Sequence, residues 1–276
     1  VGGTANGGGV LFNRVTFDGS GAALSGTQAG TGNWTIGTPG NRVQGDGLRF
    51  DGPSGNLQFN SLDIANDNGT GLYVDTKTLG TSFSLATTNP ASVDTTNGSA
   101  LFLDPLTVNM TFSGLSSTNS GTNGIWLDGV SGNLTVTGTT NSTNAGGHGI
   151  LIENSDGTFN FNDINVDTPG ADGIHINNTP SATINFNGTT TIQGTIGDGI
   201  DLSSAGGGVT FSTTSISGAG ADGINLSNAT GTYTFGGTTI NGFEATSVGI
   251  DFAGAAANAT FGVTDIGNGG VGTAID

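Results

Sequence analysis

The chain has 276 residues, of which 53 are glycine and none is cysteine, and its formal net charge at pH 7 is −17. The lack of cysteine excludes disulfides, thiol catalysis and cysteine-ligated metals, and the composition disfavours long helices. Only four residues are Lys or Arg, and none follows Lys77. We therefore expect no nucleic acid partner, and we expect anionic membranes and polyuronates to be disfavoured. No apolar run approaches the ~20 residues of a membrane span, so no membrane insertion is expected.

A five-residue strand pattern recurs along the whole chain at intervals of 23 to 29 residues. Its copies in chain order are GLRFD (47–51), GLYVD (71–75), ALFLD (100–104), GIWLD (124–128), GILIE (149–153), GIHIN (173–177), GIDLS (199–203), GINLS (223–227), GIDFA (249–253) and GTAID (272–276). A second pattern follows most copies, in the segments NLQFN (56–60), NLTVT (133–137), TFNFN (158–162), TINFN (183–187), GVTFS (208–212), TYTFG (232–236) and NATFG (258–262). A third short run ends at an aliphatic residue, at Ile64, Val166, Ile192, Ile216, Ile240 and Ile266.

Alternating short strands separated by Gly, Asn and Ser corners predict an all-β fold, a parallel β-helix or solenoid. We expect one domain over residues 1–276, with about ten turns of ~25 residues and three strands per turn. The crossover rule favours a right-handed coil. The looser alignment over residues 78–123 predicts an irregular or widened turn. Neither end shows a cap, so we expect a segment of a longer protein or a rod that stacks end to end.

Stacking of the turns predicts three inward columns of like residues. The first column contains Phe59, Phe112, Val136, Phe161, Phe186, Phe211, Phe235 and Phe261. The second contains Leu57, Met110, Leu134, Phe159, Ile184, Val209 and Tyr233. The third contains Thr139, Thr190, Thr214, Thr238 and Thr264. Buried hydroxyls of this kind are expected to be hydrogen-bonded.

The first strand of each turn also predicts two outward columns. One contains Arg49, Tyr73, Phe102, Trp126, Leu151, His175, Asp201, Asn225 and Asp251. The next contains Asp51, Asp75, Asp104, Asp128, Glu153, Asn177, Ser203, Ser227 and Ala253. The aromatic stripe of Tyr73, Phe102 and Trp126 beside carboxylates predicts a glycan-binding surface, because sugar faces are weakly apolar and their hydroxyls need acceptors. The alternative is that a loop from residues 78–123 covers these rings.

Carboxylates one turn apart lie only ~5 Å from each other. Asp104, Asp128 and Glu153 should therefore repel, and a bound cation, raised pKa values or splayed rotamers would relieve the repulsion. A second oxygen ladder is formed by Asp172, Asp198 and Asp222, each of which precedes a glycine. Calcium accepts several oxygen ligands in flexible geometry, so these three aspartates allow a calcium site. No other cofactor is expected.

A catalytic interpretation also has residues to support it. Its candidates are Asp198, Asp201, His175, Asp172 and His148. GHGI (147–150) resembles the Gly-His-Gly motif of polygalacturonases and DGIDL (198–202) resembles their first aspartate strand, which implies a polysaccharide hydrolase with a paired acid and base. The order of the two motifs is reversed here, and the Asp-Asp pair and Arg-x-Lys clamp of that family are missing. Asp-Gly is also ordinary corner chemistry, so we expect no enzyme.

The outward positions of the second strand form an uncharged polar array. They are Asn109, Thr111, Asn133, Thr135, Thr158, Asn160, Thr183, Asn185, Gly208, Thr210, Thr232, Thr234, Asn258 and Thr260. Strand geometry spaces them ~7 Å along the strand and ~4.8 Å between turns. The array resembles the Thr-x-Thr faces of solenoid ice-binding proteins, although Asn replaces Thr at many positions. The alternative is that the composition reflects β-propensity and Asn stacking alone.

Taken together, the GI-x-L and T-F-x-F strands resemble the β-helical stalks of large bacterial surface proteins, such as autotransporter-like passengers and haemagglutinin-like adhesins. The resemblance implies a secreted or cell-surface rod that spaces, adheres or assembles. Its partners would be further copies of itself or cell-surface glycans. A non-enzymatic structural or adhesive role is thus expected, with ice or glycan binding and polysaccharide hydrolysis as the alternatives.

Overall fold

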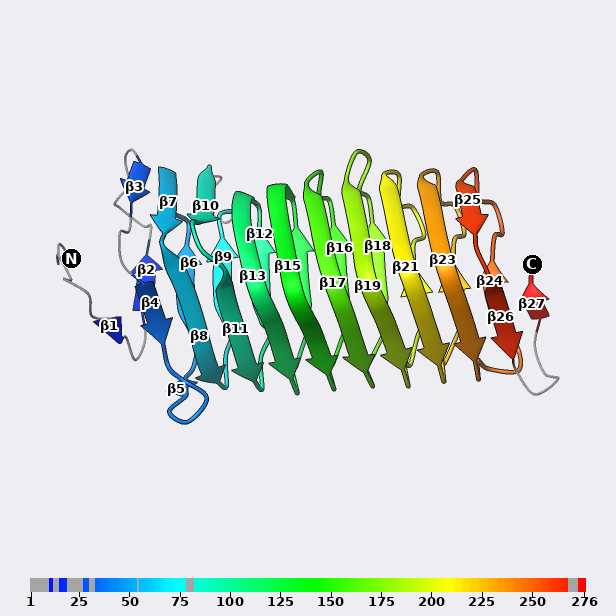
Figure 1. Ribbon diagram of the computed structural model, residues 1–276, viewed down its shortest axis with the longest axis horizontal. Helices are drawn as coiled ribbons and strands as arrows, with labels where there is room; N and C mark the ends of the chain where they lie inside the picture. Colours follow the sequence, from blue (N-terminus) through cyan, green and yellow to red (C-terminus); the bar gives the residue numbers. More distant parts are fainter. Residues whose placement is uncertain are drawn as a thin grey trace.

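The computed structural model describes residues 10–11, 15–18, 27–29, 33–53, 55–77, 82–267 and 273–276. Every regular element in these ranges is a β-strand, and the paired strands are parallel. The strands stack as a single-domain β-solenoid of about nine turns, which confirms the predicted fold class with one turn fewer than expected. Figure 1 shows the turns following one another along the long axis, from β1 at one end to β27 at the other.

The turns build two sheets that pack face to face around one apolar core. The short-strand sheet consists of β2 (Val15–Asp18), β6 (Leu48–Asp51), β9 (Leu72–Asp75), β12 (Leu101–Asp104), β14 (Ile125–Asp128), β16 (Ile150–Glu153), β18 (Ile174–Asn177), β20 (Ile200–Asp201), β22 (Ile224–Asn225), β24 (Val248–Asp251) and β27 (Thr273–Ile275). The long-strand sheet consists of β1 (Val10–Leu11), β3 (Thr27–Ala29), β4 (Asn33–Ile36), β5 (Val43–Gln44), β7 (Gly55–Phe59), β8 (Ser61–Asp67), β10 (Phe83–Thr87), β11 (Ala91–Thr96), β13 (Leu106–Thr118), β15 (Val130–Thr143), β17 (Thr158–Asp167), β19 (Thr183–Gln193), β21 (Gly208–Ser217), β23 (Thr232–Asn241), β25 (Asn258–Phe261) and β26 (Thr264–Gly267). The strands of the two sheets run in opposite directions in Figure 1.

The predicted second and third runs of a turn are continuous in the middle of the rod. They form one strand in β13, β15, β17, β19, β21 and β23, and remain separate as β7 and β8, β10 and β11, and β25 and β26. The irregular or widened turn predicted for residues 78–123 begins with residues 78–81, which lie outside the described residues. From β10 onward the strands of that region pair in register with their neighbours, apart from local bulges.

The two predicted apolar columns line the core, which confirms the assignment of faces. Their members are buried, except that Leu57 and Phe261 are partly buried. Phe186, Phe211 and Phe235 stack with ring centroids 4.4 and 5.1 Å apart and interplanar angles of 7° and 4°. The ~4.8 Å spacing between adjacent strands therefore sets the spacing of the rings.

The third inward column differs from the prediction at one turn, where Thr140 faces the core in place of Thr139. Thr140 is buried and pairs with Ile164, whereas Thr139 is exposed. The register shifts between Val136 and Thr139, because β15 carries one more residue than β17 at this bend. A bulge of this kind moves every following side chain to the other face, and a repeat alignment without the partner strand does not reveal it.

The hydroxyls of this threonine column were predicted to be hydrogen-bonded, but the fully buried ones are not. Thr190, Thr214 and Thr238 are buried with Thr140, and no hydroxyl of these four has a hydrogen-bond partner among the described residues. Thr264 is partly buried and donates to the carbonyl of Gly262 at 3.3 Å. The column therefore packs through its methyl groups rather than through a hydroxyl ladder.

Asparagine forms the corner that follows β8, β11, β13 and β15. Asn68, Asn97, Asn119 and Asn144 have φ angles of 61°, 58°, 55° and 52°. This left-handed conformation is accessible to Asn because its short polar side chain bonds locally. The Nδ2 atom of Asn97 donates to Oδ1 of Asn68 at 3.0 Å, and Asn144 donates likewise to Asn119 at 3.0 Å. Side-chain amides thus connect successive corners as well as shaping them.

Glycine before each short strand has a packing cause. A Cβ atom at Gly173 would lie 2.5 Å from the carbonyl oxygen of Gly199 and would also meet Ile192 Cγ2. A Cβ atom at Gly199 would likewise lie 2.6 Å from the carbonyl oxygen of Gly223. Alanine takes this position at residue 100. Close contact between adjacent turns therefore explains the recurrent Gly-Ile pair.

Replacing Gly173 by Ala should lower the free energy of unfolding by roughly 1–3 kcal/mol, because the backbone of Gly199 must move to admit the methyl group. Gly237→Ala is the matched control, since a Cβ atom there meets nothing within 4 Å. Urea denaturation of both variants measures the difference. Equal stability of the two variants would show that the corner tolerates the extra carbon.

Candidate functional site

The residues that precede the glycine of each Gly-Ile pair lie at a corner of the solenoid and form a column. Their side chains join successive turns. Oδ1 of Asp172 accepts the amide of Asp198 at 2.8 Å, and Oδ1 of Asp198 accepts the amide of Asp222 at 2.8 Å. Asp222 in turn accepts the amide of Val248 at 2.7 Å. Each predicted calcium ligand therefore has one oxygen engaged by backbone. The Asp-Gly pairs have a structural role at the corners.

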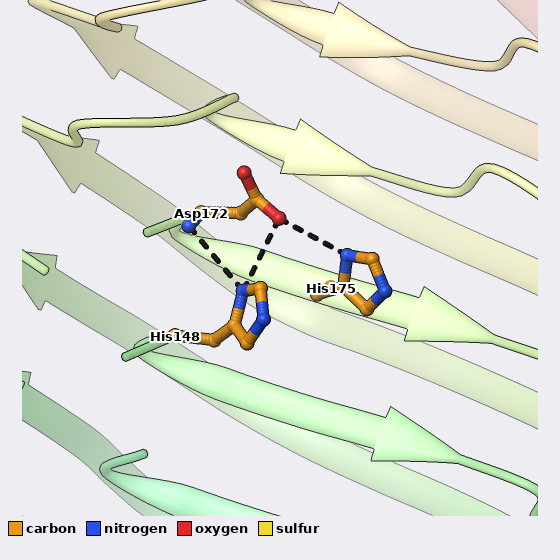
Figure 2. A group of neighbouring side chains, drawn as sticks. All are labelled: His148, Asp172 and His175. Carbon is orange, nitrogen blue, oxygen red and sulfur yellow. Dashed lines mark hydrogen bonds and ion pairs between the residues drawn. The ribbon is translucent and has the colours of Figure 1, made fainter. Parts of the chain in front are cut away.

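His148 occupies the same corner column one turn before Asp172, and here the column meets a second histidine. Figure 2 shows Nδ1 of His148 and Nδ1 of His175 directed at one carboxylate oxygen of Asp172, at 3.1 and 3.0 Å. The two imidazole rings stack with centroids 4.6 Å apart. His175 Nδ1 also lies 2.8 Å from Oδ2 of Asp201 on the next turn. Four side chains from three turns thus converge.

Charge and burial shift the pKa values of the titratable side chains at and beside this convergence. Burial by itself lowers the pKa of His175, but contacts with Asp172 and Asp201 outweigh it and raise that pKa to about 9. Burial opposes ionisation of Asp172, yet the two imidazoles and the amide of Asp198 hold its pKa well below the usual range. Burial raises the pKa of Asp198 to about 6, and hydrogen bonds from Asn225 and the Asp222 amide only partly offset this.

The structure brings together some of the predicted catalytic and metal residues and separates others. Among the described residues, the group whose donor atoms all lie within 4.8 Å of one another is His148, Asp172 and His175. Asp198 and Asp222, predicted with Asp172 as calcium ligands, are not in that group. Asp201 contacts His175, as above, and its Oδ1 accepts the amide of Ser203 at 2.8 Å. Asp198 and Asp201, both 8% exposed, therefore connect turns rather than form an open acid and base pair.

The predicted aromatic stripe lies in register on β9, β12 and β14. Tyr73 and Phe102 stack with centroids 4.7 Å apart, and Phe102 meets Trp126 edge to face at 4.9 Å. Arg49 lies 3.8 Å over the Tyr73 ring, and Trp126 Nε1 donates to Glu153 at 3.0 Å. The three rings are only partly exposed. Their neighbours in the column cover much of the ring surface that a sugar would need.

A lysine relieves the repulsion predicted for the acidic ladder. Lys77 Nζ lies 2.8 Å from Asp128 and 3.5 Å from Asp104. Asn154 donates a further hydrogen bond to Asp128 at 2.7 Å. Burial and the neighbouring Asp128 still raise the pKa of Asp104, and Lys77 opposes that rise. Of the three predicted forms of relief, a raised pKa is present at Asp104, whereas the positive charge comes from Lys77 of the chain itself and not from the bound cation that was predicted.

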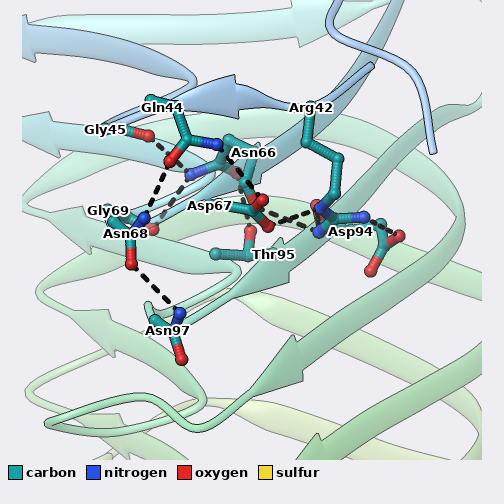
Figure 3. Close-up of polar contacts among 10 residues, drawn as sticks. All are labelled: Arg42, Gln44, Gly45, Asn66, Asp67, Asn68, Gly69, Asp94, Thr95 and Asn97. Atoms are coloured by element: carbon teal, nitrogen blue, oxygen red, sulfur yellow. Dashed lines mark hydrogen bonds and ion pairs between the residues drawn. The ribbon is translucent and has the colours of Figure 1, made fainter. Parts of the chain in front are cut away.

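Arg42 relieves a similar repulsion between carboxylates of the long-strand sheet. Its guanidinium lies 2.6 Å from Asp67 on β8 and 2.5 Å from Asp94 on β11, and it also donates to the carbonyl of Asn66 (Figure 3). Arg49 pairs with two aspartates of its own turn in a comparable way. Each Lys or Arg in the described part of the chain therefore neutralises carboxylates within the rod.

The polar array faces outward on the long-strand sheet as predicted. One column runs in register through Thr111, Thr135, Asn160, Asn185, Thr210, Thr234 and Thr260. The other runs through Asn109, Asn133, Thr158, Thr183, Gly208, Thr232 and Asn258. Asn185 Nδ2 donates to Asn160 Oδ1 at 2.9 Å. The two columns form a regular array across seven turns of the rod.

No protein-family model, curated protein or solved structure matches this chain in the three comparisons that were made. The described residues contain no helix long and apolar enough to cross a membrane.

Sequence reasoning identified the histidines and aspartates but missed how they meet. His148 and Asp172 share one column, whereas His175 belongs to another, and the convergence depends on the corner between the two columns. Lys77 was missed altogether as a partner, because Asp128 lies 51 residues away along the chain. A signal was available: Lys77 is the last cation before a run of stacked carboxylates.

Lys77→Met should lower the free energy of unfolding at pH 7 by about 1–2 kcal/mol, a value reduced because the lysine side chain is 64% exposed. Without the lysine, the pKa of Asp104 rises further. A raised carboxyl pKa destabilises the fold above that pKa, so the loss should fade below about pH 4 as the carboxyls protonate. Urea denaturation at pH 7 and pH 3.5 measures both values, with Lys77→Arg as control. Equal losses at both pH values would attribute the effect to packing of the lysine stem.

Proposed function

We propose that this chain is a non-enzymatic structural or adhesive rod, secreted or displayed on a cell surface, whose contact surface is the outer face of the long-strand sheet. Its partner is a further copy of the chain or a cell-surface glycan. The placement outside the cell rests on the resemblance to β-helical stalks and on the absence of cysteine. The contact surface rests on the distribution of charge between the two sheets.

The observation that carries the proposal is the low charge of the long-strand face from β13 to β23, although the same sheet carries acids in β8, β11 and β26. No charged residue occurs in β13, β15, β19, β21 or β23, and β17 has only Asp163 and Asp167. The short-strand sheet and its corners carry many of the acids, including Asp104, Asp128 and Asp201. A chain of net charge −17 repels its own copies and acidic surfaces from most directions. Its flat, hydroxyl-rich and amide-rich face allows close approach without that repulsion.

The use of the acids supports a role without catalysis. Glycoside hydrolysis requires two carboxyl groups on either side of an open substrate position. Asp172, Asp198 and Asp222 each accept a backbone amide of the next turn, and Asp201 accepts one within its own turn. These side chains maintain the stacking of turns, which a rod needs along its whole length.

Placing charge on the long-strand face from β13 to β23 should abolish association. Thr135→Glu combined with Thr210→Glu adds two charges to the array, and Ser203→Glu combined with Ala253→Glu adds two charges to the short-strand face as the matched control. We expect wild type and control to associate or bind glycans, and the array variant to do neither. Sedimentation velocity, negative-stain microscopy and a glycan array measure these outcomes.

Two results would contradict the proposal. One is a wild-type chain that stays monomeric at high concentration and binds no glycan. The other is release of reducing ends from a polysaccharide panel that is lost in Asp201→Asn, because it would establish a hydrolase at the short-strand face. Circular dichroism of each variant confirms that the β-structure is retained.

Ice binding is the second candidate, and the register of the two polar columns favours it. Hydroxyls and methyls repeating at ~7 Å along the strand and ~4.8 Å between turns provide a regular template for ordered water. The asparagines in the array interrupt the methyl pattern, which is why we place this function second.

Thermal hysteresis tests the ice-binding candidate directly. If the array binds ice, wild-type protein should show a freezing-point hysteresis that Thr234→Tyr abolishes, because a bulky ring disrupts the flat surface. Asn225→Ala, on the opposite sheet, is the control and should retain the effect. Absence of hysteresis in the wild-type protein would end this candidate.

A further inference from the structure

The convergence of His148, Asp172, His175 and Asp201 goes beyond the proposed rod and does not depend on it. His148 and Asp172 are corner residues on successive turns, His175 lies on β18, and Asp201 lies on β20. Nδ1 of His175 is 3.0 Å from Asp172 and 2.8 Å from Asp201, and Nδ1 of His148 is 3.1 Å from Asp172. Two nitrogen atoms and one carboxylate oxygen therefore lie within 4.8 Å of one another, as Figure 2 shows, and Asp201 contacts this group through His175.

Hydrogen bonds alone do not satisfy this arrangement. Nδ1 of His148 lies 3.3 Å from the backbone amide of Asp172 and 3.1 Å from its carboxylate, and one imidazole nitrogen cannot accept from the first and donate to the second at the same time. His175 Nδ1 carries at most one hydrogen, yet it contacts two carboxylates. Protons on the two Nδ1 atoms therefore cannot satisfy all of these contacts at once. A cation placed among these atoms would turn those contacts into ligand bonds.

We propose that His148, Asp172 and His175 form a binding site for a divalent transition metal such as zinc, with Asp201 in contact with His175 beside it. Imidazole nitrogen and carboxylate oxygen are ligands that zinc, cobalt, nickel and copper accept, whereas calcium prefers oxygen alone. The site thus differs in ligand chemistry from a calcium ladder at the corner aspartates.

The distances are compatible with such an ion. Zinc bonds of ~2.0–2.1 Å to nitrogen and oxygen place tetrahedral donors ~3.3 Å apart, so the close pairs need to open by only ~0.3 Å. The three atoms of His148, Asp172 and His175 lie within 4.8 Å of one another, a spread that rotation of the imidazole rings closes. The four side chains keep between 11% and 23% of their surface exposed, which leaves a route from solvent.

Electrostatics and topology give the site a consequence. No Lys or Arg occurs from residue 78 onward, so the local field attracts cations. The ligands come from two successive turns, which the metal would connect. Because the ligands assemble only in the folded solenoid, metal binding stabilises that state by mass action.

Titration of chelator-treated wild-type protein with Co²⁺ tests the site. We expect visible ligand-field absorption that saturates at one equivalent, is displaced by Zn²⁺ and persists in a hundredfold excess of Ca²⁺. Zn²⁺ should also raise the Tm by several degrees. Loss of the Co²⁺ spectrum to Ca²⁺, or no spectrum at all, would overturn the proposal, because an acidic surface alone binds both ions without imidazole.

Variants assign the ligands. His148→Gln and His175→Gln should each weaken Zn²⁺ binding at least tenfold, whereas Asp251→Asn, in the same outward column two turns beyond Asp201, should leave it unchanged. Unchanged affinity in both histidine variants would overturn the assignment. If either variant fails to fold, electron paramagnetic resonance of Cu²⁺ bound to wild-type protein decides: hyperfine coupling to two imidazole nitrogens is required, and its absence refutes the site.

Discussion

Parallel pairing of each turn with the next is the constraint on which the rest of this structure depends. Adjacent strands lie ~4.8 Å apart, so a residue on one turn has its closest contacts with the residue at the same position on the next. Apolar residues gain from that arrangement, as the stacked phenylalanines Phe186, Phe211 and Phe235 show. Glycine avoids a clash where two backbones meet corner to corner, as at Gly173 and Gly199.

The same constraint makes carboxylates a problem, because like charges are stacked as readily as like rings. The repulsion between stacked carboxylates is relieved by different groups in the two halves of the chain. Toward the N-terminus Arg42 and Lys77 each bridge carboxylates of two turns. After residue 77 no such cation exists, and backbone amides, Asn225 and the two histidines take over the role.

Periodicity in the sequence was sufficient to predict the fold class, the inward columns of Phe and Leu, and the outward columns of both sheets. These features repeat with the turn, so each copy supports the others. The prediction was wrong where the repeat is interrupted: the bulge in β15 moved Thr139 out of the core and Thr140 into it. It also could not find Lys77, whose contacts with Asp104 and Asp128 occur once and leave no periodic trace.

The division of charge between the two sheets links these observations to the proposed function. Acids concentrated on the short-strand side can be neutralised by cations and amides within the rod, because that side contains the corners where turns approach closely. On the long-strand sheet, Arg42 relieves the stacked carboxylates of β8 and β11, and no Lys or Arg occurs in the strands from β13 to β23 to do the same. Uncharged threonine and asparagine can repeat on a flat face without that repulsion. The low charge of this face is thus consistent with the stacking of turns, and it is the feature on which the proposed contact surface rests.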